Sequence, residues 1–114
     1  MRIISGKYKG MPIVLPRDMK MRPTTDFAKE GLFNVLNNMI CFEETELLDL
    51  FAGTGGITYE FISRNCVSTV SVEINSRQCA FISQMCKKLE APKSFVVKAD
   101  VFKYLCRHVF NLLD

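Results

Sequence analysis

Short apolar runs alternate with helical patterns from residue 47 onwards, and this alternation constrains the fold more than any other feature of the chain. The runs at 47–51, 68–74 and 94–99 predict strands, and the spacing of apolar residues predicts helices over 57–64, 76–89 and from Val101 onwards. Helical crossovers between consecutive strands are typical of a parallel sheet. The sequence therefore predicts an α/β fold with a parallel sheet and helices on both of its faces.

The amino-terminal part of the chain has a different pattern. Residues 2–15 hold two β-rich arms around Gly6 and Gly10, which predicts a small β-ribbon, and Pro16 to Pro23 bound a loop. Thr24 or Thr25 could cap a helix over 26–39. Helical spacing predicts that this helix buries one apolar face, formed by Ala28, Leu32, Val35, Leu36 and Met39.

Charge is concentrated at the amino end. The chain carries a net charge of +3, but residues 1–22 hold six basic residues against the single acid Asp18, so this segment is +5 and the remainder is −2. A basic end on a nearly neutral body indicates a polyanionic partner. A solvated basic surface without a partner explains the same charges, and both interpretations stay open on charge alone.

The cysteines, the single histidine and the hydropathy indicate what kinds of site and cellular environment to expect. The five cysteines are odd in number and none forms a C-x-x-C pair, which is typical of reduced thiols in a cytoplasmic protein. His108 is the only histidine and no ligand pair lies near it, so no metal site is expected. No stretch approaches the roughly 20 apolar residues of a membrane span, and the start turns polar by Ser5, unlike a signal peptide. A membrane partner is therefore not expected.

The turn after the first predicted strand is the strongest local signal of a ligand. It lies in "LLDLFAGTGG", residues 47–56, where Gly53 and Gly55 would let the backbone approach a ligand closely. A dinucleotide fingerprint fails because Thr58 stands where the third glycine belongs, and no Gly-Lys-Ser/Thr follows to make a phosphate-binding loop. A tight strand-to-helix link with no ligand is the alternative.

Acidic residues at the strand ends narrow the class of ligand. Glu73 ends the second strand, 20 residues after Gly53, where a carboxylate can accept both hydroxyls of a ribose. Asp100 could accept an adenine amino hydrogen, or could simply cap the following helix. Asp49 could orient the turn or meet an ammonium group. A nucleoside with an amino-acid tail, such as S-adenosylmethionine, suits this set better than a pyrophosphate.

Several of these stretches resemble known motifs. "LLDLFAGTGG", "SVEIN" and "KADVFKYL" resemble the cofactor motifs of class I methyltransferases, whose sheet is Rossmann-like. The opening "MRIISGKYKG" and the stretch "RPTTDFAKEGLFNVL" resemble the RsmD-type family, bacterial methyltransferases that act on the exocyclic N2 of a guanine in 16S ribosomal RNA. The resemblance covers essentially the whole chain.

The resemblance implies roles for individual residues. It implies that 1–23 form a basic ribbon and loop that bind RNA, as an arm on an incomplete S-adenosylmethionine-binding domain, 24–114, with the first three strands of the sheet. Arg22 and Thr24 could instead flank the cofactor pocket. The implied RNA contacts are Arg2, Lys7, Lys9 and Arg22, and the substrate would be 16S ribosomal RNA or the small ribosomal subunit. The implied cofactor contacts are Asp49, Phe51, Gly53, Thr54, Gly55, Glu73, Ile74, Asp100 and Val101.

One element of the family pattern is missing. Exocyclic amine methyltransferases carry an Asp/Asn-Pro-Pro-aromatic motif after the fourth strand, whereas the prolines here stand singly at 12, 16, 23 and 92. No catalytic residue is therefore assigned, and we expect an amino-terminal part that is inactive alone, with the helix from Val101 continuing to Asp114. Without a fourth strand, 47–51 would have an open apolar edge that favours self-association. Another nucleic-acid methyltransferase, or a non-catalytic RNA-binding module if the gene ends at 114, are the alternatives.

Overall fold

The computed structural model describes residues 1–19 and 24–113, and side chains as far as His108. The predicted order of strands and helices is confirmed, and the strand boundaries differ from the prediction by one residue at most. The elements are α1 (Asp26–Leu36), a short 3-10 helix η1 (Phe42–Glu44), β1 (Glu46–Leu50), α2 (Gly56–Ser63), β2 (Ser68–Glu73), α3 (Ser76–Lys88), β3 (Ser94–Lys98) and α4 (Val101–Leu113).

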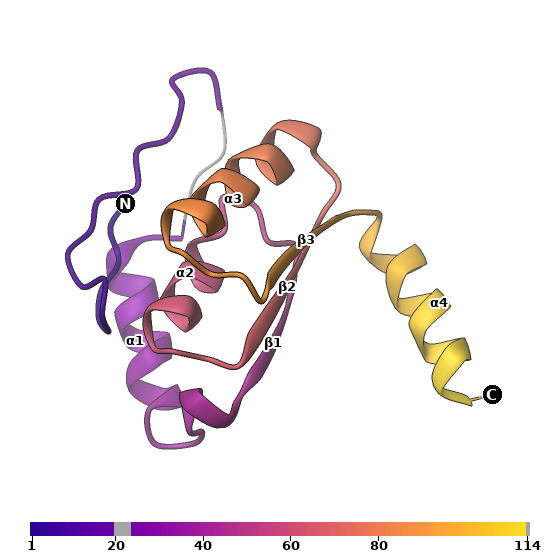
Figure 1. The fold of residues 1–114 in the computed structure, drawn as a ribbon, viewed down its shortest axis with the longest axis horizontal. Coiled ribbons are helices and arrows are strands. Elements are labelled where there is room, and N and C mark those ends of the chain that lie inside the picture. The colour runs from indigo at the N-terminus through magenta and orange to yellow at the C-terminus, as the bar shows by residue number, and fades with distance from the viewer. Residues whose placement is uncertain (20–23, 114) are drawn as a thin grey trace.

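The three strands form a parallel sheet in the order β1-β2-β3, as predicted. Helices cover only one face of it among the described residues. Side chains of α2 and α3 meet in a single core cluster against that face, whereas α4 leaves the end of β3 and points away from the body of the molecule (Figure 1). The expectation of helices on both faces is therefore wrong for this part of the chain, because no described helix lies over the second face.

The two faces of the sheet differ in composition. Leu48, Val70 and Phe95 pair across the three strands and share the open face, where the exposed fraction of Leu48 is 46% and that of Phe95 is 56%. On the opposite face Thr69 and Ser71 are completely buried beneath the helices. The open face thus exposes large apolar side chains, while the covered face includes completely buried hydroxyl groups.

The helix α1 differs from the prediction in its length and in its buried face. It ends at Leu36 rather than at Met39, and it buries Lys29 and Phe33 while Leu32 and Val35 stay exposed. The apolar stripe is not the contact face because two long-range contacts turn the helix: Lys29 reaches a buried carboxylate on α2, and Phe33 joins an aromatic cluster. The Thr25 side chain caps the helix by accepting from the Ala28 N–H at 3.1 Å.

The polar contact beneath α1 is a buried ion network centred on Glu60 of α2. Its carboxylate accepts from Lys29 Nζ at 2.9 Å and from a guanidinium nitrogen of Arg64 at 2.7 Å. It also accepts the backbone N–H of Ile4, at 3.0 and 3.1 Å to its two oxygens. Glu60 and Lys29 are completely buried. This one carboxylate therefore fastens both α1 and the amino-terminal ribbon to α2.

The ribbon is present as a pair of antiparallel arms, joined by a single bridge between Arg2 and Pro12 and by a 2.9 Å hydrogen bond from Ile3 N to Met11 O. Ile3 and Ile13 are buried and belong to the same core cluster as α2 and α3. The ribbon is therefore packed onto the sheet-and-helix body and shares its core. Among the described helices, none is long and apolar enough to cross a membrane.

Candidate functional site

The turn between β1 and α2 holds an unusual backbone. Phe51, Gly53 and Gly55 all have positive φ, of 57°, 59° and 86°. Such a value is rare for a bulky residue like Phe51 and is found mostly where the surrounding structure imposes it. Here the sheet contributes, because Ala52 N, next to Phe51, donates to Val72 O of β2 at 3.0 Å and ties the start of the turn to β2.

Gly55 is required at its position for two reasons. Its left-handed conformation disfavours any residue with a Cβ, and a Cβ there would lie 2.5 Å from the Tyr59 ring. Tyr59 packs this closely because its hydroxyl donates to the Thr54 carbonyl at 2.6 Å, inside the turn. Gly53, Thr54 and Gly55 are all buried, so the turn is a rigid connection and not a mobile loop.

Glu73, at the carboxyl end of β2, is fixed in place by the turn. Its Oε1 accepts from Gly53 N at 2.9 Å and its Oε2 accepts from Asn75 N at 2.8 Å. With its amide oriented to donate, Gln78 also lies 3.1 Å from Glu73 Oε1. A carboxylate has about four acceptor positions, so these bonds orient the group and still leave it able to accept from a ligand.

A hollow of about 80 Å³ lies beside Glu73, at the carboxyl ends of the strands. Five of the nine residues implied for the cofactor line it together: Phe51, Glu73, Ile74, Asp100 and Val101. Asp49, Gly53, Thr54 and Gly55 do not line it. Gly53 acts through Glu73, because its N–H donates to the Glu73 carboxylate that lines the hollow. Thr54 and Gly55 shape the turn itself.

The hollow has two further lining residues that the sequence did not indicate, Ala99 and Phe102. Phe102 lies within the apolar helical pattern that begins at Val101, where burial is usual, but its exposed fraction is 73% and its ring meets the Phe51 ring edge-on, with centroids 6.2 Å apart. The signal that could have found it is its position two residues after Asp100, in the first turn of α4. Two exposed aromatic rings therefore stand at the mouth of the hollow.

Asp100 takes the capping role that the sequence left open, and one of its oxygens stays available for a ligand. Its Oδ1 accepts from Lys103 N at 3.1 Å, which caps α4. Within the described part of the chain, its Oδ2 has no hydrogen-bond partner, so this oxygen can face a ligand in the hollow. Capping holds the carboxylate at the edge of the hollow, and the two roles are compatible.

Asp49 supports the turn from the covered face of the sheet. The Thr58 hydroxyl donates to Asp49 Oδ2 at 2.7 Å and lies 2.8 Å from the Ser71 hydroxyl, so the three groups join β1, α2 and β2. Burial raises the pKa of Asp49, against the lowering effect of the Thr58 hydrogen bonds. These contacts favour the orienting role for Asp49. A contact with an ammonium group remains a prediction.

The residues implied for RNA contact lie in different places. Arg2 makes an exposed ion pair with Asp26 of α1, at 3.2 Å. Lys7 and Lys9 lie near the tip of the ribbon, where Lys7 N donates to Ser63 O at the end of α2. Arg22 is outside the described residues. The structure therefore does not gather these basic side chains into one patch beside the hollow.

The site fits the nucleoside part of S-adenosylmethionine in the chemistry of its side chains. Glu73 offers an anchored carboxylate for a ribose diol, Asp100 offers an acceptor for an exocyclic amine, and Phe51, Ile74 and Phe102 offer apolar surface for a flat base. The hollow is well below the ~300 Å³ at which ligand pockets usually begin. The described residues therefore do not enclose a pocket of the usual size by themselves. No group of three or more His, Cys, Asp or Glu residues in the described part of the chain could hold a metal ion.

Comparison with known proteins places these features in a family. The family model described as Conserved hypothetical protein 95, of the RsmD family, matches residues 1–111. The chain is 33% identical over 104 residues to ribosomal RNA small subunit methyltransferase D of Buchnera aphidicola (subsp. Baizongia pistaciae), covering 91% of this chain and 53% of that protein. The Escherichia coli K12 protein of the same name is 30% identical over 106 residues, covering 93% and 52%.

A solved structure agrees with the fold. The Escherichia coli protein yhhF superimposes with a TM-score of 0.80 at 30% identity, covering 92% of this chain and 56% of that one. The architecture is that of the class I methyltransferases, represented by its amino-terminal part. The chain spans about half the length of the curated relatives it matches.

Proposed function

We propose, since this chain belongs to the RsmD family described as Conserved hypothetical protein 95, that it is the amino-terminal part of an S-adenosylmethionine-dependent methyltransferase. The proposed substrate is 16S ribosomal RNA, free or in the small ribosomal subunit, and the proposed acceptor is the exocyclic N2 of a guanine. The names of the relatives support a ribosomal RNA substrate. The choice of N2 follows from the sequence resemblance alone.

The observation that carries the proposal is the placement of Glu73. Its carboxylate is held by the backbone of the glycine turn, and it stands in the same hollow as Asp100 and two exposed aromatic rings. Ligands in open parallel sheets bind at the carboxyl ends of the strands. The hydrogen bonds to both oxygens hold the carboxylate in one orientation beside the apolar hollow, as a ligand-binding acid requires.

The residues of this chain would bind and orient the cofactor, and none of them is assigned a proton transfer. S-adenosylmethionine supplies an electrophilic methyl group when it is bound. Glu73 and Asp100 would hold the ribose and the base, and the rigid turn would fix their position relative to the sheet. A guanine N2 is a weak nucleophile, so positioning and electrostatics must provide most of the rate. We expect the groups that orient the amine to come from outside residues 1–114, and this chain alone to be inactive.

The first test addresses the cofactor and uses the full-length protein. Glu73→Ala should weaken binding of S-adenosylhomocysteine by about 1.5–3 kcal/mol, the range for hydrogen bonds to a charged group, as measured by calorimetry. The 2′-deoxyribose analogue should bind wild type and variant more nearly alike, because it lacks one hydroxyl that Glu73 would accept. Glu46→Ala, at the exposed start of β1, is the matched control. Unchanged affinity in Glu73→Ala would overturn the ribose assignment.

The second test addresses the substrate. The full-length protein should transfer methyl groups to 16S ribosomal RNA or to small subunits, and not to duplex DNA or free nucleosides, with the product identified as N2-methylguanine by mass spectrometry. Methylation of DNA would favour another nucleic-acid methyltransferase. Binding of RNA without transfer would favour a non-catalytic module.

The open face of the sheet supports a proposal about the 114-residue chain by itself. Leu48 and Phe95 are about half exposed on that face, and β1 has no described partner on its outer edge. Open edges beside apolar surface favour pairing between copies. We therefore expect the isolated chain to self-associate through this edge, and a monomer in light scattering at high concentration would contradict the expectation.

A further inference from the structure

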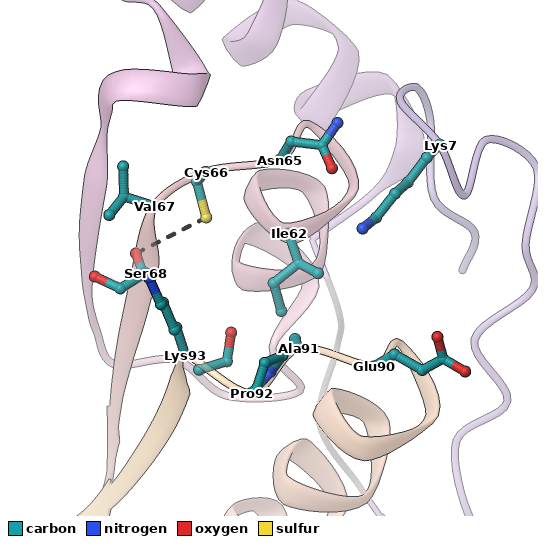
Figure 2. Close-up of a pocket in the computed structure, with 11 residues that line it drawn as sticks. Lys7, Ile62, Asn65, Cys66, Val67, Ser68, Glu90, Ala91, Pro92 and Lys93 are labelled. Atoms are coloured by element: carbon teal, nitrogen blue, oxygen red, sulfur yellow. Dashed lines mark hydrogen bonds between the residues drawn. The ribbon is translucent and has the colours of Figure 1, made fainter.

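A groove lies at the amino ends of β2 and β3, on the edge of the sheet opposite to the hollow beside Glu73. The groove has a volume of about 260 Å³ and adjoins a second hollow of about 600 Å³. The two hollows share residues of the α3–β3 connection. The first is lined by Lys7 of the ribbon, by residues 65–68 after α2 and by residues 90–94 before β3 (Figure 2). We refer to the lining of this first hollow as the amino-edge groove.

Lys7 is held at this groove by the way the ribbon docks. Its backbone N–H donates to Ser63 O at 2.8 Å, and the N–H of Tyr8 donates to Ser63 Oγ at 3.0 Å. The Tyr8 hydroxyl donates to Leu89 O at 2.6 Å, which fastens the ribbon to the end of α3. The Lys7 backbone is thus fixed on both sides, and the side chain reaches toward the hollow near Ile62 (Figure 2).

The charges around the groove are mainly positive. Lys93 lies on the opposite side of the hollow from Lys7, close to Ser68, and the Glu90 carboxylate points outward (Figure 2). Lys87 lines the adjoining hollow. The floor between the two lysines is apolar, made by Ile62, Ala91 and Pro92, with polar groups of Asn65, Ser68 and Ser94 around it. Two cations facing each other across such a floor fit a sugar–phosphate backbone.

The carboxyl ends of two helices offer another explanation for lysines at this place. α2 and α3 both end at this edge, and the partial negative charge at a helix carboxyl end attracts lysines even where nothing binds. Lys88 shows that effect without the groove, because it occupies the last turn of α3 and lines neither hollow. The helix ends account for Lys87 and Lys88, but they do not account for a ribbon that carries Lys7 to the far side of the hollow.

We propose that the amino-edge groove binds the phosphodiester backbone of an RNA at a point remote from the nucleotide that is methylated. The inference rests on the proposed function and adds a second contact region to it. β2 has six residues, so at ~3.3 Å per residue the groove and the hollow lie about 17 Å apart along the sheet. An RNA that reaches both must extend across the body of the protein, which a free nucleoside or a very short strand does not do.

The test compares Lys7→Ala, Lys93→Ala and the double variant with Lys88→Ala, all in the full-length protein. Binding of a 16S ribosomal RNA transcript is measured by fluorescence anisotropy across a salt series. Each groove lysine should contribute a salt slope of about 0.7–0.9 and a five- to eightfold change in affinity at about 0.1 M salt, the share of one released counterion. Lys88→Ala should leave the slope unchanged. S-adenosylhomocysteine affinity and the melting temperature, which report on cofactor site and fold, should stay at wild-type values in all four variants.

The outcomes separate the two proposals. Unchanged RNA affinity and salt slope in the double variant, with a wild-type protein that does methylate RNA, overturn the groove and leave the function standing. Equal losses in Lys88→Ala and in the groove variants also overturn it, because they show a general charge effect. A shallower slope confined to the groove variants supports it. If a short oligonucleotide that cannot cross the sheet shows no difference in salt slope between wild type and the groove variants, the result supports a groove that is remote from the methylated nucleotide. A wild-type protein that binds no RNA overturns both proposals.

Discussion

The two ends of this chain are attached to the sheet by different means. At the amino end, α1 and the ribbon are fastened to α2 by a buried network in which Glu60 binds Lys29, Arg64 and the Ile4 backbone. At the carboxyl end, α4 is attached through its first turn, by the Asp100 cap and the buried Val101. The sequence patterns of both helices are amphipathic. The comparison teaches that an amphipathic pattern indicates a need for a partner, while specific long-range contacts decide whether the helix has one.

The largest loss of stability is expected from removing the Glu60 carboxylate, which holds the amino-terminal elements on α2. Glu60→Ala leaves the buried Lys29 without its counter-charge and the Ile4 N–H without its acceptor, so the free energy of unfolding should fall by about 3–5 kcal/mol. Urea denaturation monitored by circular dichroism measures it. Glu30→Ala, one position from Lys29 but exposed, should change stability by less than about 0.5 kcal/mol. A loss below 1 kcal/mol in Glu60→Ala would show that the network does not hold the amino end.

Gly10 in the ribbon and Gly55 in the turn before α2 separate the cost of backbone strain from the cost of overpacking. Gly55 and Gly10 have nearly equal φ, 86° and 84°, but only Gly55 has an atom within 4 Å of the position of a Cβ. Gly10→Ala should therefore lower stability by about 1–2 kcal/mol from the left-handed backbone alone. Gly55→Ala should lose about 1–3 kcal/mol more from overpacking against Tyr59. Equal losses in thermal denaturation would mean that Tyr59 can move aside.

The pH dependence of stability tests the hydrogen-bonded group beneath the turn. The raised pKa of Asp49 means that the folded state binds its proton more tightly than the unfolded state does. The ionised form is therefore penalised by folding, and the penalty is relieved as pH falls through the folded pKa. Asp49→Asn should be more stable than wild type at pH 7 and equal to it below about 3.9, the unperturbed aspartate value, in urea denaturation. It should also bind cofactor more weakly if Asp49 meets an ammonium group. Lower stability of the variant at pH 7 would contradict this.

The smallest effect is expected at the carboxyl end. Phe102→Ala in α4 removes a large side chain that is mostly exposed, so stability should change by less than about 0.5 kcal/mol. Ile82→Ala, in the completely buried face of α3, should by contrast lose about 2–5 kcal/mol. Calorimetric melting of the two variants side by side would reveal any hidden packing of α4, which would appear as a loss of more than 1 kcal/mol in Phe102→Ala.

The sequence predicted local features well and long-range ones poorly. The strands were found within a residue of their ends because buried parallel strands form apolar runs. The sequence singled out Gly53 and Glu73 for their 20-residue spacing, but the hydrogen bond that joins them was not predicted. The buried face of α1 was missed because Lys29 pairs with a residue 31 positions away, which no pattern within one helix can show. Phe102 was missed because an apolar residue in a helical pattern is usually buried, and the pattern gives no sign that this ring is exposed.

The place where the ribbon docks could not be predicted from local sequence patterns either. Its basic residues suggested one RNA-binding arm, but hydrogen bonds to Ser63 place Lys7 at the amino edge, while Arg2 pairs with Asp26. Beyond the ribbon, Asp18 reaches Arg77 in the first turn of α3, at 2.6 Å. The first 19 residues therefore contact both the end of α2 and the start of α3, which charge counting alone could not indicate.

The hydrogen bond from the Tyr8 hydroxyl to Leu89 O joins residues 81 positions apart, and this separation has a kinetic consequence. A contact that closes so long a loop carries a large entropy cost, and contacts of this kind usually form after local ones. During synthesis the ribbon emerges before α3, so the contact of Tyr8 with Leu89 must wait for that helix, although α2 is already able to bind the ribbon through Glu60 and Ser63. Weakening that docking should accelerate unfolding more than it slows folding. A segment that is synthesised before α3 would then complete its tertiary contacts after it.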